Sequence, residues 1–268
     1  MTEITFPKLP FIKRKEKPRE TGINYVRAPV MVGNCIDDYL EAYANLVDIF
    51  KISGKQGAMM SKKSLLRFIE TCKKHSVQVA LGNPIMDVAL SGGKEVVDDY
   101  LDTVVSLGID IIEISRIARS LDDDEMCRLI ENASSKGIKV INEVGVAFAH
   151  SKVIEEEIFI ERIKMQSKRF IEAGSWKILL ESEGWTENLE KKNYRWNVID
   201  KIIALQNEVK FLKKKNILYS KDFLTKLYKG YLGINLKNNI ICFLEHVNDL
   251  DSNESRLLTD IIKSNHDK

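Results

Sequence analysis

The sequence has few cysteines, few prolines and no long hydrophobic run, and each shortage excludes a class of protein. None of the four cysteines forms a Cys-x-x-Cys pair, which argues against a disulfide framework or a cysteine-based zinc site. No apolar stretch is long enough to span a bilayer. The first residues carry Pro7, Pro10 and a charged run over 13–16, without the apolar core of a secretory signal. We therefore expect a cytoplasmic protein.

The chain also lacks a large excess of positive or negative charge. The chain has 41 Lys and Arg against 39 Asp and Glu, a net charge of +2 over 268 residues. This balance gives no reason to expect nucleic acid or an anionic membrane as the partner. The remaining composition, 44% hydrophobic and 30% charged, is that of a globular protein long enough to bury a sizeable core.

Short apolar runs alternate with helical patterns after a polar, proline-marked arm over residues 1–20. The periodicity predicts strands over 23–26, 46–52, 77–81, 109–114, 138–141 and 176–180. It predicts helices over 36–45, 61–74, 94–107, 122–136 and 155–173, with Ser61 as an N-cap. Gly82-Asn83-Pro84 is typical of a turn. Because nearly every run is apolar on both faces, the alternation indicates a parallel sheet covered by helices.

Residues 184–239 fit this alternation less well, and we expect a helical insertion there, with helices near 197–215 and 220–229. A seventh run over 240–244 precedes a last helix near 254–263. A closed parallel barrel needs eight strands. We therefore expect one α/β domain over 21–268, a (β/α) TIM-type barrel that is incomplete or irregular at its C-terminal end. Alternatively, another segment takes the place of the eighth strand, or the chain contains an eighth strand that the sequence pattern does not reveal.

A doubly wound open sheet is the alternative fold, although no Gly-x-Gly-x-x-Gly loop follows the first run. An incompletely closed barrel would leave strand edges that need cover. Such edges favour formation of a homo-oligomer, or cover by the C-terminal segment.

Charged side chains recur at the ends of the expected strands, where parallel barrels carry their functional residues. These positions are Lys51, Glu113, Ser115, Arg116, Glu143, Glu181, Glu183 and Glu245. Glutamates that converge on one mouth repel each other unless a cation lies among them, and Mg²⁺ together with Lys51 and Arg116 would supply that charge. A purely structural role, in which salt-bridged polar residues close the barrel end, explains the pattern as well.

Several segments together resemble the phosphosulfolactate synthase family, TIM-barrel enzymes that add sulfite to phosphoenolpyruvate with magnesium on the route to coenzyme M. The matching stretches are residues 17–23, Phe50-Lys51, Glu113-Ile114-Ser115, Glu143-Val144-Gly145, 173–174, 178–181 and 243–245. The resemblance implies a lyase acting on a small anionic substrate. It implies metal ligands at Glu113, Glu143, Glu181 and Glu245, and catalytic roles for Lys51, Arg116 and Glu143. It implies substrate contacts from Lys55, Gly82, Asn83, Ser115 and Glu183.

The chain departs from the family pattern mainly where cations are expected. Ala28-Pro29 replaces an Asp-Lys pair, Val146 replaces a lysine, and no arginine follows Glu181. Since the family's substrates are anions, these losses weaken the expected binding. They leave two alternatives open: a diverged barrel that acts on another small anionic or carbonyl substrate in a biosynthetic pathway, and a non-catalytic, stress-related homologue.

Overall fold

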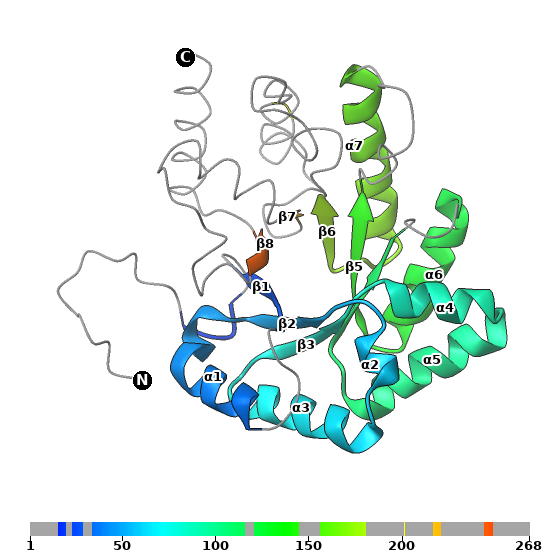
Figure 1. Cartoon of the computed structure of the whole chain (residues 1–268). Helices are drawn as coiled ribbons and strands as arrows, with labels where there is room; N and C mark the ends of the chain where they lie inside the picture. The colour runs from blue at the N-terminus through cyan, green and yellow to red at the C-terminus, as the bar shows by residue number, and fades with distance from the viewer. Residues whose placement is uncertain are drawn as a thin grey trace, which may run out of the picture.

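Eight strands form a closed barrel in the order β1 to β8, with helices packed around its described part (Figure 1). The computed structural model describes residues 16–19, 23–28, 34–115, 121–144, 156–180 and 201, together with the backbone of 217–220 and 244–248. The strands are β1 (Asn24–Arg27), β2 (Ile49–Ile52), β3 (Gln78–Leu81), β4 (Ile111–Ile114), β5 (Lys139–Val144), β6 (Lys177–Leu180), β7 (Ile217–Ser220) and β8 (Leu244–Asn248). The TIM-type barrel expected from the sequence is confirmed.

The helices of the described residues follow the strands in the expected alternation. They are α1 (Cys35–Tyr43), α2 (Gln56–Met59), α3 (Lys62–Lys74), α4 (Pro84–Ser91), α5 (Lys94–Leu107), α6 (Asp123–Ser135) and α7 (Glu156–Glu172), with a 3₁₀ turn over Ala44–Leu46. Ser61 caps α3, as predicted, by accepting a hydrogen bond from the Ser64 backbone N–H. None of these helices is long and apolar enough to cross a membrane.

Two separate apolar clusters follow from the alternation of side chains along each strand. The larger cluster lies between barrel and helices and includes Phe50, Phe68 and Phe170. The smaller cluster fills the barrel interior and consists of Ile23, Tyr25, Ile49, Ala80, Ile111, Ile141 and Leu179. Strands that are apolar on both faces are therefore covered on both faces, as the sequence indicated.

The C-terminal end of the barrel is irregular, in the sense that its last strand is reversed. The strands from β1 to β7 are paired in parallel, whereas β8 runs antiparallel to both β7 and β1. The strand missing from the sequence count is β7, inside the range where we expected only helices. The last strand covers Leu244–Asn248 rather than 240–244. The helices expected at 197–215, 220–229 and 254–263 lie outside the described residues, with two exceptions. Lys201 is described as helical, and Ser220 is the last residue of β7.

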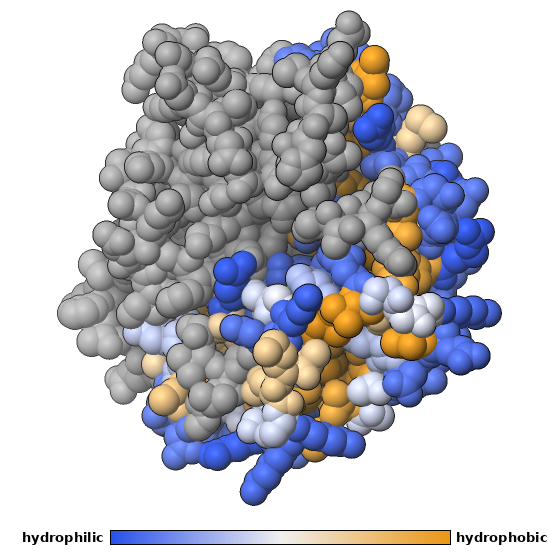
Figure 2. Space-filling view, turned by 45° about the vertical axis from the view of Figure 1, so that its right-hand side comes forward, coloured by the Kyte–Doolittle hydropathy of each residue, from blue (hydrophilic) through white to orange (hydrophobic). Residues whose placement is uncertain are grey.

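The turn expected at Gly82-Asn83-Pro84 is present after β3, but a helix that the sequence did not predict follows at once, because Pro84 is already the first residue of α4. Proline suits this position because the first helical N–H has no partner in the helix. The expectation of a subunit interface stays a prediction. On the face seen in Figure 2, hydrophobic groups lie among hydrophilic ones. Over the described residues, the exposed large apolar side chains include Val88, Val96 and Val105.

Candidate functional site at the C-terminal mouth

The ends of the parallel strands bring several of the expected residues to one mouth of the barrel. Lys51 is level with Ala80, and Ala80 is level with Ile111, so Glu113 lies two residues further toward the C-terminal mouth. Glu113 is level with Ile141, so Glu143 lies one layer beyond it. The interior therefore changes from apolar residues in its middle layers to charged residues at this mouth.

Lys51 and Glu113 form a buried ion pair at the centre of this site. The distance from Lys51 Nζ to Glu113 Oε2 is 2.9 Å, and the two side chains are 10% and 1% exposed. The Tyr25 hydroxyl donates a hydrogen bond of 2.8 Å to Glu113 Oε1. The ammonium of Lys51 also lies 5.8 Å from the centre of the Tyr25 ring. Both carboxylate oxygens of Glu113 thus accept from a defined donor, which is what a buried carboxylate requires.

Gly82 leaves room for this ion pair. A Cβ atom at this position would lie 3.2 Å from Lys51 Cε, 3.2 Å from the Ile52 carbonyl oxygen and 3.6 Å from Glu113 Oε2. Two of these distances are tighter than ordinary contacts. The glycine therefore lets β3 pass close to the lysine side chain and the carboxylate.

Asn83 connects the ends of β3 and β4. Its Oδ1 atom accepts a 2.9 Å hydrogen bond from the Ser115 backbone N–H, and its Nδ2 atom donates to Asp87 Oδ2 at 2.8 Å. Asn83 is 2% exposed and Ser115 is 1% exposed. This network fixes the segment after β4, so Asn83 is a positioning residue for the mouth.

The structure describes only some of the other predicted site residues. Glu143 is buried at the end of β5, whereas Lys55 is exposed and directly precedes α2. The backbone of Glu245 lies near the start of β8, which is at the same mouth because β8 is reversed. The register slips there, and Glu245 forms a bulge opposite Tyr25 and Val26. Arg116, Glu181 and Glu183 lie outside the described residues.

The expected metal site can be judged on two of its four carboxylates, Glu113 and Glu143. Within the described residues, no group of three or more His, Cys, Asp or Glu side chains is placed to hold a metal ion. Mg²⁺ usually takes only one or two protein carboxylates and completes its shell with water and substrate oxygens. Glu143 fits such a site by its chemistry. Glu113 fits it through water, since a direct bond would compete with Lys51 and Tyr25.

Sequence reasoning missed Tyr25. The signal was present, because Tyr25 shares a strand face with Ile23 and therefore points into the barrel with the residues at the other strand ends. Tyrosine in such an apolar interior needs a hydrogen-bond partner for its hydroxyl, and an acidic residue at a neighbouring strand end is a candidate.

One family model and several curated relatives match this chain. The sequence model of (2R)-phospho-3-sulfolactate synthase (ComA) matches residues 12–217. The protein HEAT-STRESS-ASSOCIATED 32 of Arabidopsis thaliana is 24% identical over 211 residues, covering 71% of this chain and 73% of that protein. Phosphosulfolactate synthase of Methanothermobacter thermautotrophicus is 24% identical over 186 residues, covering 69% and 70%. The family match spans most of the barrel, and the chain belongs to the (2R)-phospho-3-sulfolactate synthase family.

Proposed function

We propose that this protein is a phosphosulfolactate synthase-like lyase that adds sulfite, or a related nucleophile, to phosphoenolpyruvate. The observation that carries the proposal is the buried Lys51–Glu113 ion pair, held by Tyr25 at the C-terminal mouth of a barrel of this family. Lysine at such a mouth binds anionic groups of a substrate, and Glu113 holds its ammonium in place.

The addition forms one carbon–sulfur bond at the methylene carbon of phosphoenolpyruvate. The electron pair of the double bond moves toward the neighbouring carbon and its carboxylate, and one proton is taken up at that carbon. No bond to phosphorus breaks. A cation near the substrate carboxylate stabilises the charge that develops there, and Lys51 is one described residue suited to this role.

We also propose a magnesium requirement, with Glu143 as a direct ligand and Glu113 acting through water. Bound Mg²⁺ would neutralise the developing negative charge of the substrate. Glu181 and Glu245 remain proposed ligands, and Arg116, Lys55, Ser115 and Glu183 remain proposed substrate or catalytic residues. The cytoplasm is the proposed location.

The direct test is mass spectrometry of a reaction with phosphoenolpyruvate, sulfite and Mg²⁺, against a reaction without enzyme. Formation of phosphosulfolactate is expected. Lys51→Gln should lower kcat/KM by about 100-fold, whereas Lys62→Gln, the same charge change at an exposed site on α3, should leave it unchanged. Full activity of Lys51→Gln would exclude the assigned role, and absence of product from folded protein would exclude the reaction.

A second candidate function rests on the similarity to HEAT-STRESS-ASSOCIATED 32. In that case the barrel has lost catalysis and serves in a stress response. Folded protein would then form no product and bind neither phosphoenolpyruvate nor Mg²⁺ in calorimetric titrations. Binding of phosphoenolpyruvate without turnover would instead favour a diverged enzyme with another small anionic substrate.

A further inference from the structure

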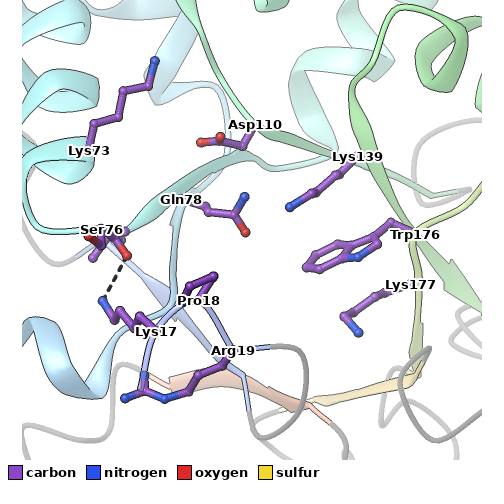
Figure 3. A pocket seen from close by; sticks show the side chains of 11 residues that line it. Lys17, Pro18, Arg19, Lys73, Ser76, Gln78, Asp110, Lys139, Trp176 and Lys177 are labelled. Atoms are coloured by element: carbon purple, nitrogen blue, oxygen red, sulfur yellow. Dashed lines mark hydrogen bonds between the residues drawn. The ribbon is translucent and has the colours of Figure 1, made fainter. Parts of the chain in front are cut away.

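A cavity lies at the N-terminal mouth of the barrel, opposite the Lys51–Glu113 site (Figure 3). Its volume is about 790 Å³, within the range of small-molecule sites. The walls come from the segment around Pro18, the end of α3 and the starts of β3, β5 and β6. The apolar cluster inside the barrel separates this cavity from the Lys51–Glu113 site.

Positive charge dominates the lining of this cavity. The cations in its wall are Lys17, Arg19, Lys73, Lys139 and Lys177, whereas its only acidic lining residue in the described part of the chain is Asp110. This excess is larger than the net charge of +2 of the whole chain. Cations gathered in a cavity with low-dielectric walls raise the local concentration of anions.

Some of these groups are fixed by contacts with the protein. The Arg19 guanidinium donates to Asp48 Oδ1 at 2.6 Å, so this charge is already balanced. Lys17 Nζ donates to the Ser76 carbonyl oxygen at 3.1 Å. Asp110 Oδ2 accepts from the Val79 backbone N–H at 2.9 Å, so this carboxylate serves to hold β3. These contacts give the cavity a defined wall before any ligand is present.

Lys139 and Lys177 bring two ammonium groups to one wall of the cavity. Their ammonium groups lie 4.8 Å and 4.7 Å from the centre of the Trp176 ring, one on either side of it in Figure 3. Lys177 is 2% exposed, an unusual degree of burial for a lysine. Because the indole is engaged by two cations, it is poorly suited to stack on a nucleobase, and the cavity favours compact anions.

We propose that the N-terminal mouth of the barrel binds a small oxyanion carrying at least two negative charges, with Lys139 and Lys177 as its main ligands and Lys73 as a further cation on another wall. A phosphate compound and a polycarboxylate share this chemistry. The proposal does not depend on the reaction assigned to the other mouth.

Calorimetric titration of the whole chain tests this site, with pyrophosphate and citrate as separate probes. Saturable binding of at least one anion is expected. Tighter binding of pyrophosphate would identify the ligand class as phosphate, and tighter binding of citrate as polycarboxylate. Lys139→Gln should weaken the binding about tenfold, as expected for one charge-assisted hydrogen bond. Lys62→Gln, the same charge change at an exposed site away from the cavity, should not weaken it.

Lys73→Gln provides a second variant on another wall if Lys139→Gln fails to fold, as judged by circular dichroism. It should also weaken the binding. Absence of saturable binding, or equal affinity in the folded cavity variant and the wild type, would overturn the proposal. Binding that is lost in Lys51→Gln but kept in the cavity variants would place the anion at the C-terminal mouth and also overturn it.

Discussion

Lys51 and Glu113 depend on each other because both are removed from water. Lys51→Met removes the ammonium beside a carboxylate that is 1% exposed, and should lower the free energy of unfolding by about 3 kcal/mol. Adding Glu113→Gln should restore part of that loss, since the uncompensated charge is then gone. Urea unfolding of the two single variants and the double variant measures the coupling. Additive losses would mean that the pair does not interact energetically.

Cysteine reactivity offers a test of burial at single residues. Burial raises the pKa of the Cys72 thiol to about 12, while Asp110 adds to this shift and Lys17 opposes it. The reactive thiolate of Cys72 is therefore nearly absent at pH 8. Exposed Cys35 should react with iodoacetamide much faster than Cys72, as followed by peptide mass spectrometry. Equal labelling of both in native protein would contradict the burial of Cys72, and labelling in urea is the control.

At the scale of elements, Asp37 ties α1 to the end of α3. It pairs with Lys74 at 2.9 Å and with His75 at 2.6 Å. The hydrogen bond to His75, followed by that to Lys74, lowers the pKa of Asp37. A lowered carboxyl pKa stabilises the fold above the carboxyl's unfolded pKa, and this stabilisation is lost as the pH falls through the folded value.

Asp37→Asn should therefore lower the melting temperature slightly at pH 7, and the difference from wild type should narrow as the pH falls below about 4 and through the lowered pKa of Asp37. Circular dichroism melts between pH 2.5 and 7 measure both effects. Glu70→Gln, which removes an exposed carboxylate from α3, serves as the control. A difference that persists unchanged at pH 2.5 would rule out the charge of Asp37 as its origin.

The elements with a strong local signal were those that the sequence predicted well. Helix α5 covers Lys94–Leu107 as expected, and α6 begins after Asp122, which forms a capping box with Glu125. The strand over 217–220 was missed because it has only four residues and follows a lysine-rich run. Such a short segment shows too little of the alternation between polar and apolar residues that predicts a strand. The reversal of β8 depends on tertiary pairing, which no local pattern encodes.

For the site, strand-end positions predicted Lys51, Glu113 and Glu143 at one mouth, and the register bears out that placement. Their chemistry remains a prediction. The Tyr25–Glu113 hydrogen bond joins residues 88 positions apart. It follows from the closure of the barrel rather than from any spacing in the chain. For the same reason, the cationic cavity at the other mouth was not predicted.

The whole barrel is closed by one reversed strand. Val247 in β8 is paired with Asn24 of β1 on one side and with Tyr219 of β7 on the other. Proline here removes a backbone donor from a strand that is paired on both sides, so Val247→Pro should lower the free energy of unfolding by at least about 2 kcal/mol. Thermal and urea unfolding measure the change. Val247→Ala is the matched control, and equal stability of the two variants would show that β8 does not close the barrel.

The apolar layer inside the barrel separates its two mouths. Ile49, Ile111 and Ile141 belong to this layer, with Lys51, Glu113 and Glu143 at one mouth and the lysine-lined cavity at the other. Because the layer belongs to the buried core, we expect an exchanged residue at one mouth to leave the shape of the other intact. Such a barrel can lose or change its chemistry at one end while the opposite end evolves on its own.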